Sequence, residues 1–373
     1  MFYHFLTPLS DWFGVFNVFI YITFRAAGAA ATAILMAFLV GPPVIKWLKR
    51  FNVGQVVRAD GPASHQEKRG TPTMGGVIII AATIIPTLLW ARLDNRYVLV
   101  AIFATLWAGG IGFVDDYLKI VQQKSRGLVA RYKLIGQMSF GIGLGIYLLL
   151  FPLATNLEAT ATTVPFFKWY LLSIPPVLYV LFVSLVVTGT SNAVNLTDGL
   201  DGLAAGLSVI AAGAFAIFAY VIGRSDASEY LQIFYLVNSG ELTIFCASLT
   251  GASLGFLWFN SHPAEVFMGD TGSLALGGAF GTVAILLKSE FLLLIVGAVF
   301  AAEAVSVILQ TAVFKYRRKK FGVEHARAHR LFRMAPLHHH YEKAGLAETK
   351  IVTRFYIIGI LCALVALATL KIR

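Results

Sequence analysis

The chain contains ten long apolar runs, and their length is what most restricts its possible folds. A transmembrane α-helix needs about twenty predominantly apolar residues. The eighth run is short and glycine-rich, but without it the later basic loops would fall on the wrong side of a membrane. The runs occupy residues 17–40, 74–90, 97–114, 134–151, 169–188, 203–222, 242–259, 274–287, 291–314 and 351–370. The sequence therefore predicts about ten transmembrane helices.

Composition favours an all-α polytopic membrane protein. Of the 373 residues, 58% are hydrophobic and only 13% are charged, whereas a soluble domain carries about a quarter charged residues. The runs are continuous and do not alternate as the strands of a membrane β-barrel do. We find no internal repeat, soluble domain or removable signal peptide, so we expect one membrane domain over residues 1–373. Cys246 and Cys362 lie in apolar runs and are interpreted as packing residues.

Basic residues are concentrated in three connecting segments. Segments 46–72, 115–133 and 315–350 contain 6, 5 and 10 Lys and Arg residues, and Arg354 raises this side to 22 of the 30. Cytoplasmic loops of membrane proteins carry such an excess. We therefore expect both termini outside and a working cytoplasmic face.

Residues 192–202, Asn-Ala-Val-Asn-Leu-Thr-Asp-Gly-Leu-Asp-Gly, form a polar stretch between two apolar runs. It holds the candidate site residues Asn192, Asn195, Asp198 and Asp201, without a Lys or Arg. We predict a cytoplasmic loop whose two acids direct oxygen ligands toward one point if a helix begins here. Capping of the next helix is the alternative. One cap accounts for only one or two of these side chains, so we favour a functional loop.

Three further acids lie where predicted spans meet the cytoplasm. Asp115 and Asp116 directly follow the third span, and Asp270 lies between glycines in the segment 260–273. Adjacent carboxylates repel each other unless a cation neutralises them. In proteins Mg²⁺ usually takes one or two carboxylates together with substrate phosphate and water. A solvated helix end and a helix cap are the alternatives, and both remain open.

Basic groups on the same side are candidates for binding an anion. Lys68 precedes a glycine-rich stretch that includes Thr73, where backbone N–H groups near a helix N-terminus suit an anion. Lys133 opens the fourth span. Anchoring to lipid headgroups explains both lysines as well.

His338, His339 and His340 are consecutive, and on a helix neighbours point about 100° apart, so they cannot all face one metal. Hydrogen bonding to phosphate, or proton handling near pH 7, fits better. Glu303 and Gln310 share one face of the ninth span. Glu303 should face the bundle interior, because it is an acid inside a span.

Acids and basic groups thus come from five inner segments at the depth where spans meet the cytoplasm. A metal held by acids, with cations around it, is suited to a pyrophosphate substrate. A lipid phosphate and a soluble nucleotide can meet only at this depth. The residues therefore favour phosphoryl-type transfer from a cytosolic donor to a membrane acceptor.

Five stretches resemble a known family. Over nearly its full length the chain resembles the phospho-N-acetylmuramoyl-pentapeptide transferases, a branch of the polyprenyl-phosphate N-acetylhexosamine-1-phosphate transferase superfamily. The two Asp-rich stretches mark the superfamily, and the first stretch and the triple histidine mark the branch. Residues 319–329 make the loop before the histidines longer than is usual in this branch. The matching stretches are residues 68–76, 112–117, 192–202, 267–270 and 335–342.

The resemblance implies an Mg²⁺-dependent enzyme of peptidoglycan synthesis in the bacterial cytoplasmic membrane, usually a homodimer. UDP-N-acetylmuramoyl-pentapeptide would react with undecaprenyl phosphate to give lipid I and UMP, with no nucleic-acid partner. Asp270 would bind the metal, and Asp115 and Asp116 would contact it or handle the acceptor phosphate. The implied catalytic residues are Asp115, Asp116, Asp270, Lys133 and His338. The implied substrate-binding residues are Lys68, Thr73, Asn192, Asn195, Asp198, Asp201, Asn260, Phe267, Gln310, His339 and His340.

Two other functions compete with this expectation. A transferase that moves N-acetylglucosamine-1-phosphate onto the same lipid is the alternative within the enzyme class. An ion-coupled secondary transporter is the alternative from another class. Transporter sites usually lie near the membrane midplane in repeated halves, whereas Glu303 is the one acid here placed clearly that deep.

Overall fold

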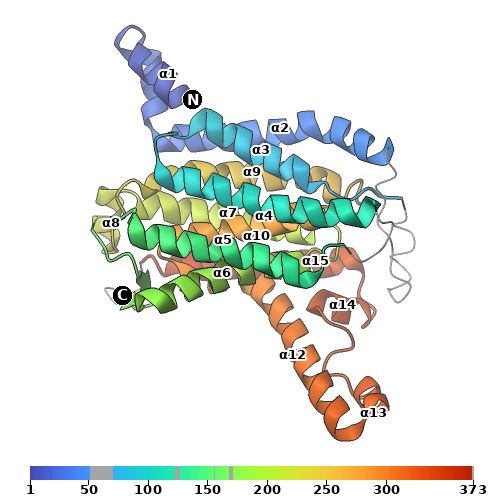
Figure 1. The fold of residues 1–373 in the computed structure, drawn as a ribbon. Helices are drawn as coiled ribbons and strands as arrows, with labels where there is room; N and C mark the ends of the chain where they lie inside the picture. Colours follow the sequence, from blue (N-terminus) through green and yellow to red (C-terminus); the bar gives the residue numbers. More distant parts are fainter. Residues whose placement is uncertain (51–69, 122–126, 155, 168–170, 372–373) are drawn as a thin grey trace.

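The computed structural model describes residues 1–50, 70–121, 127–154, 156–167 and 171–371, and these form a helical bundle (Figure 1). The first half contains α1 (Phe2–Leu6), η1 (Thr7–Asp11), η2 (Gly14–Ile20), α2 (Ile22–Arg50), α3 (Gly76–Trp90), α4 (Arg96–Val121), α5 (Ala130–Leu150), β1 (Ala161–Thr163), β2 (Leu171–Ser173) and α6 (Pro176–Thr197). The second half contains α7 (Leu203–Ile222), α8 (Ser225–Leu231), η4 (Ser239–Glu241), α9 (Leu242–Asn260), α10 (Gly269–Leu286), α11 (Glu290–Val296), α12 (Ala298–Phe321), α13 (Val323–Ala328), α14 (Leu337–Glu342) and α15 (Glu348–Ala368).

The predicted all-α polytopic class is confirmed. Within the described residues, eight helices are long and apolar enough to cross a membrane, namely α2, α4, α5, α6, α7, α9, α12 and α15. Two predicted spans correspond to α3, which is shorter, and to α10, which is not among the eight. The number of ten spans and their orientation therefore stay predictions. The two short strands pair as an antiparallel hairpin that the sequence did not suggest.

Helix α10 occupies the interior and packs against α3, α4 and α6. Its residues from Thr271 to Leu286 are all buried. Small residues let neighbouring backbones approach closely, and the distances here require glycine. A Cβ on Gly76 would lie 2.0 Å from the backbone nitrogen of Gly272, and one on Gly112 would lie 2.1 Å from the carbonyl oxygen of Asp270. The glycine-rich composition that made this span look weak therefore suits a central position.

Three predicted boundaries were wrong. Helix α6 continues to Thr197, so most of the stretch predicted as a loop is helical. Helix α4 continues to Val121, which puts Asp115 and Asp116 inside the helix. The predicted ninth span is interrupted at Gly297, between α11 and α12. Polarity marked the segments after the apolar parts of α4 and α6 as non-spanning, but a helix can continue past its apolar part when its polar side chains find partners in the protein.

Helix direction places the candidate residues at one end of the bundle. Helices α4 and α6 end there, and α10 begins there, so residues far apart in sequence become neighbours. Glycine at 76 and 112 fixes how close those helix ends come. The packing of the bundle therefore determines the geometry of the site.

Candidate active site

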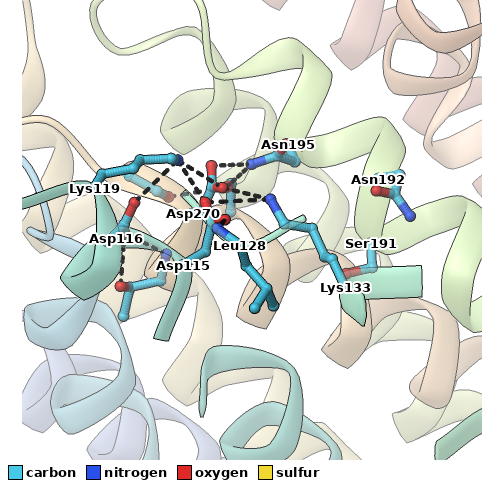
Figure 2. Close-up of polar contacts among 12 residues, drawn as sticks. Asp115, Asp116, Lys119, Leu128, Lys133, Ser191, Asn192, Asn195 and Asp270 are labelled. Carbon is cyan, nitrogen blue, oxygen red and sulfur yellow. Dashed lines mark hydrogen bonds and ion pairs between the residues drawn. The ribbon is translucent and has the colours of Figure 1, made fainter. Parts of the chain in front are cut away.

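Three carboxylates, here called the acid cluster, meet at this end of the bundle. Asp115 and Asp116 lie in the last turns of α4, and Asp270 lies in the first turn of α10. One oxygen from each carboxylate lies within 4.8 Å of the others. Asp115 and Asp116 are only 1% and 2% exposed. Figure 2 shows the three side chains directed toward one another.

Two lysine side chains neutralise part of the acid cluster. Lys119 Nζ lies 2.5 Å from Asp115 Oδ2, 3.5 Å from Asp116 Oδ1 and 2.9 Å from Asp270 Oδ2. Lys133, on α5, has its Nζ 2.6 Å from the same oxygen of Asp270 and 3.3 Å from Asp115 Oδ2. Three carboxyl groups therefore face two ammonium groups at this end of the bundle.

Hydrogen bonds from polar groups orient the carboxylates. Asp116 Oδ2 accepts the backbone N–H of Thr271 at 2.9 Å and its hydroxyl at 2.8 Å. Asn195, in the last turns of α6, donates from Nδ2 to Asp270 Oδ1 at 2.7 Å. Figure 2 shows Asn195 reaching the cluster from the opposite side to Lys119. Together with Lys133 on α5, four helices therefore contribute to one polar centre.

The acid cluster fits a divalent metal ion. Carboxylate oxygens are ligands that Mg²⁺ prefers, and those of the cluster converge from two helices. Asp115 Oδ1 accepts the backbone N–H of Leu128 at 2.7 Å, while its Oδ2 faces the lysines. A divalent cation would compete with the ammonium groups of Lys119 and Lys133 for the same oxygens. The donor set is thus suitable for Mg²⁺.

Asp198 lies beside the acid cluster, directly after α6. Its carboxyl accepts a hydrogen bond from the backbone N–H of Gly269. Burial is the main cause that raises the pKa of Asp198, to about 8, and the negative charges of Asp270 and Asp116 act in the same direction. A carboxyl with this pKa is largely protonated at neutral pH and can donate a hydrogen bond.

Thr73 and Phe267 lie at the entrance to α10. A Cβ on Gly269 would lie 2.8 Å from Thr73 Oγ1 and 2.7 Å from an oxygen of Asp116, so Thr73 borders the acid cluster. The backbone of Phe267 pairs with the segment before α3, since its N–H donates to Pro72 O at 2.8 Å. The phenyl ring remains partly exposed.

Two candidate amides are occupied by protein partners. Asn260 Oδ1 accepts the backbone N–H of Gly202 at 3.1 Å, and its Nδ2 donates to Val266 O at 2.9 Å. Asn192 Nδ2 donates to Gln137 Oε1 at 2.7 Å. Asn260 is buried, so its amide holds two loops of the protein together.

Asp201 is not part of the acid cluster. Its Oδ2 lies 3.1 Å from His262 Nδ1 and accepts the N–H of Ala264 at 3.2 Å. Its backbone N–H donates to Glu348 Oε1 at 2.7 Å. The expectation that Asp198 and Asp201 direct oxygens toward one point is therefore wrong, because Asp201 turns toward a second group at the start of α15.

His338 is fully buried between α12 and the end of α6. Its backbone N–H donates to Glu303 Oε1 at 3.1 Å, and its Nδ1 lies 3.2 Å from Glu303 Oε2. A Cβ on Gly199 would lie 2.2 Å from His338 Nε2. Glu303 faces the bundle interior, as expected, and contacts the first of the three histidines.

The other two histidines have separate partners. His339 Nδ1 lies 2.6 Å from Glu342 Oε2, and His340 Nδ1 accepts the backbone N–H of Arg333 at 3.1 Å. The three imidazoles therefore have different polar partners, although the rings of His338 and His339 are in edge contact, with centroids 4.2 Å apart.

Gln310 bonds to the backbone of Phe332 with both ends of its amide. Its Nε2 donates to Phe332 O at 3.2 Å, and its Oε1 accepts the N–H of Phe332 at 2.9 Å. Lys68 lies outside the residues that the structure describes, so its expected role stays a prediction.

Lys119 is the residue that the sequence interpretation left out of the candidate site. It contacts all three acids of the cluster. The signal was present, because side chains three and four positions apart on a helix are neighbours. Predicting a span that ended before Asp115 removed the helical spacing that relates Lys119 to that residue.

Comparisons with known proteins agree with the motifs. The model of glycosyl transferase family 4 matches residues 98–288, and a phospho-N-acetylmuramoyl-pentapeptide-transferase signature matches residues 68–80. Proteins named phospho-N-acetylmuramoyl-pentapeptide-transferase are 59% identical in Gemmatimonas aurantiaca, 50% in Geobacter sp. strain M21 and 48% in Endomicrobium trichonymphae, each over the full length of both chains. The expected resemblance is confirmed, and the chain belongs to the phospho-N-acetylmuramoyl-pentapeptide transferase family.

Proposed function

We propose that the protein transfers phospho-N-acetylmuramoyl-pentapeptide from its UDP-linked donor to undecaprenyl phosphate. The products are lipid I, an intermediate of peptidoglycan synthesis, and UMP. Full-length similarity to transferases of that name supports the substrates. The acid cluster with its two lysines is the observation that carries the chemistry.

The depth of the acid cluster suits a reaction between a lipid and a soluble nucleotide. The cluster lies where α4 ends and α10 begins, at one end of the apolar bundle. There the phosphate of a membrane-anchored acceptor can approach while its chain stays in lipid. The same end remains accessible to a nucleotide from the aqueous side.

Mg²⁺ is the metal we propose for this site, with Asp270, Asp115 and Asp116 as its ligands. When bound, it neutralises negative charge on the phosphates and on the leaving group. Lys119 and Lys133 add positive charge at the same place, which favours two anionic substrates approaching each other. Asn195 holds Asp270 in position through a 2.7 Å hydrogen bond.

Direct displacement is the mechanism we favour. An oxygen of undecaprenyl phosphate attacks the phosphorus attached to the sugar, and the bond from that phosphorus to the bridging oxygen breaks. The electron pair leaves with UMP. A lipid phosphate is already ionised at neutral pH, so its positioning matters more than a strong base.

A two-step route would pass through a phosphorylated Asp115 or Asp116. Acid-quenched enzyme mixed with donor alone would then carry phosphate on one of these residues. Trapping that species would contradict direct displacement. Residual turnover by Asp115→Asn would support it.

The decisive assay measures UMP release from each nucleotide sugar, with and without polyprenyl phosphate. We expect release from UDP-N-acetylmuramoyl-pentapeptide only when lipid phosphate and Mg²⁺ are both present. Release from UDP-N-acetylglucosamine instead would favour the alternative transferase. Absence of release from either donor, with ion-coupled uptake, would favour a transporter.

Asp270→Ala should lower the rate of UMP release by at least about a hundredfold, the usual scale for losing a group that stabilises transition-state charge. The variant removes an acid that contacts both lysines and accepts a hydrogen bond from Asn195. Asp226→Asn is the matched control, because Asp226 is exposed on α8 and pairs with Arg224 away from the cluster. Equal rates for both variants would remove the acid cluster from the mechanism.

We infer a multi-pass protein of the bacterial cytoplasmic membrane, acting on its inner side as a homodimer. The charge distribution of the loops supports the orientation, and the family resemblance supports the dimer. Crosslinking in native membranes would test the dimer.

A further inference from the structure

Residues 311–331, here called the basic arm, leave the bundle. They comprise the second half of α12, all of α13 and the residues that follow. Figure 1 shows α12 running away from the bundle to one side, with α13 at its far end. The arm therefore extends over the surroundings of the bundle and not over its own helices.

The basic arm is folded and closed at its base. The amide of Gln310 makes two hydrogen bonds with the backbone of Phe332, which joins the outgoing helix to the returning chain. Arg317 donates to the carbonyl oxygen of His329. Further out, the rings of His325 and His329 stack with centroids 4.1 Å apart. These contacts give the arm a defined shape.

The charge of the basic arm is almost entirely positive. It contains one acid, Glu324. In the part of the chain that the structure describes, none of the ion pairs involves an arm residue. The basic residues are Lys315, Arg317, Arg318, Lys319, Lys320, Arg327 and Arg330. This charge is available to an external anion.

Apolar side chains place the basic arm at a lipid boundary. Ile308 and Leu309 lie on α12 just before the arm, and both side chains are exposed. Exposed apolar side chains at this position are typical of contact with the hydrocarbon of a membrane. Within it, Tyr316 is 60% and Phe321 is 52% exposed, next to the basic run. Aromatic rings beside Lys and Arg, following an apolar segment, are typical of the membrane–water interface.

We propose that the basic arm lies along the membrane surface and binds the headgroups of anionic phospholipids. Its sideways direction puts the charges over lipid, where a polybasic segment is attracted to negatively charged headgroups. An acidic soluble partner would be better served by an arm pointing away from the membrane. The proposal is independent of the reaction, because no arm residue belongs to the acid cluster.

The simplest competing explanation is that these residues only follow the general excess of positive charge near membrane ends. Lys46, Lys49 and Arg50, at the end of α2, are a second basic run that lies outside the basic arm. They provide the matched control for charge alone.

The test uses full-length protein with Val323→Cys labelled by an environment-sensitive fluorophore, in a background of Cys246→Ala and Cys362→Ala. Val323 begins α13 and is exposed. The protein is placed in nanodiscs of phosphatidylcholine alone or with phosphatidylglycerol. We expect phosphatidylglycerol to shift the emission toward that of a less polar environment, and salt to reverse the shift.

The triple variant Arg318→Gln, Lys319→Gln, Lys320→Gln should lose most of this response. Each basic residue near an anionic surface strengthens membrane association about fivefold. Replacing three of them should therefore leave only a small part of the fluorescence shift. The variant Lys46→Gln, Lys49→Gln, Arg50→Gln should keep the response. Direct counting of co-purified phosphatidylglycerol by native mass spectrometry should show the same difference.

Two outcomes would overturn the proposal. One is identical emission in the two lipid mixtures; the other is equal loss of response in the arm variant and the α2 variant. The milder variant Lys319→Gln, Lys320→Gln serves if the triple variant does not fold. Its response should fall between those of the parent and the control, and an unchanged response counts against the arm.

Discussion

At the scale of single residues, Gly199 determines where an imidazole can lie. His338 is buried against it, with Glu303 on its other side. Because residue 199 is glycine, the imidazole of His338 can occupy space that the methyl group of an alanine would fill. The family motif supplies both residues, but their contact became visible only when α14 and the end of α6 were placed together.

Gly199→Ala should therefore displace His338 and reduce UMP release severalfold or more. A Cβ at 199 would lie 2.2 Å from His338 Nε2, which is closer than real contacts allow. Gly189→Ala, in the polar half of α6, is the control because its Cβ would meet no atom within 4 Å. There the alanine should stabilise the helix by about 0.5–1 kcal/mol. Thermal unfolding and UMP release, measured together, separate the two effects.

Asp198 should make stability depend on pH. The unfolded chain releases this proton near pH 3.8, whereas the folded protein holds it to about pH 8. Between these values the folded state binds more protons, so the contribution of Asp198 to the free energy of unfolding decreases as pH rises. In protein without added divalent cations, Asp198→Asn should flatten the decline in melting temperature between pH 5 and pH 8.

Asp226→Asn is the control for this pH dependence. Arg224 lowers the pKa of Asp226 to about 2, so it does not titrate in this range. A decline in melting temperature that is equally steep in Asp198→Asn and in the parent would show that Asp198 does not bind the proton.

At the scale of elements, a buried ion pair joins α2 to η4, just before α9. Arg25 Nη2 lies 2.6 Å from Glu241 Oε1, and Nη1 lies 2.8 Å from Oε2. Arg25 and Glu241 are 1% and 5% exposed. Neither the apolar pattern nor the motifs pointed to this pair, because its members are remote in sequence and belong to different elements.

Glu241→Ala should lower the free energy of unfolding by about 3–5 kcal/mol, because it leaves a buried guanidinium without its partner. Asp226→Ala removes one partner of an exposed pair with Arg224, and should change the same quantity far less, because solvent screens an exposed ion pair. Denaturant titration in detergent micelles measures both. If both variants changed the free energy of unfolding by a similar small amount, water or another group would be compensating for the loss of Glu241.

At the scale of the whole molecule, we predict that the end holding the acid cluster faces the cytoplasm. The basis is the concentration of Lys and Arg in the loops at that end. With Cys246 and Cys362 replaced by alanine, Glu324→Cys should react with a membrane-impermeant maleimide only in inside-out vesicles. Asp226→Cys should react only in intact spheroplasts. Reversed labelling would place the site on the outer side.

The class of fold and the family follow from the amino-acid sequence without the structure. Apolar length alone predicts membrane helices, since a bilayer leaves few other structures with satisfied backbone hydrogen bonds. The motifs, each contiguous in sequence, identified the family without structural information. The sequence predicted the ends of helices less well, as α4 and α6 show. A helix can extend through polar residues whose side chains find buried partners.

Which acids meet depends on how the helices pack. The separation of Asp115 and Asp270 depends on how closely α4 and α10 pack, and Gly112 sets that distance. Asp201 is excluded because α6 ends at Thr197 and the chain then turns through Gly202, at φ 80°, before α7. Short-range sequence patterns predict neither the approach of α4 to α10 nor the direction of Asp201, since both depend on the contact of one helix backbone with another.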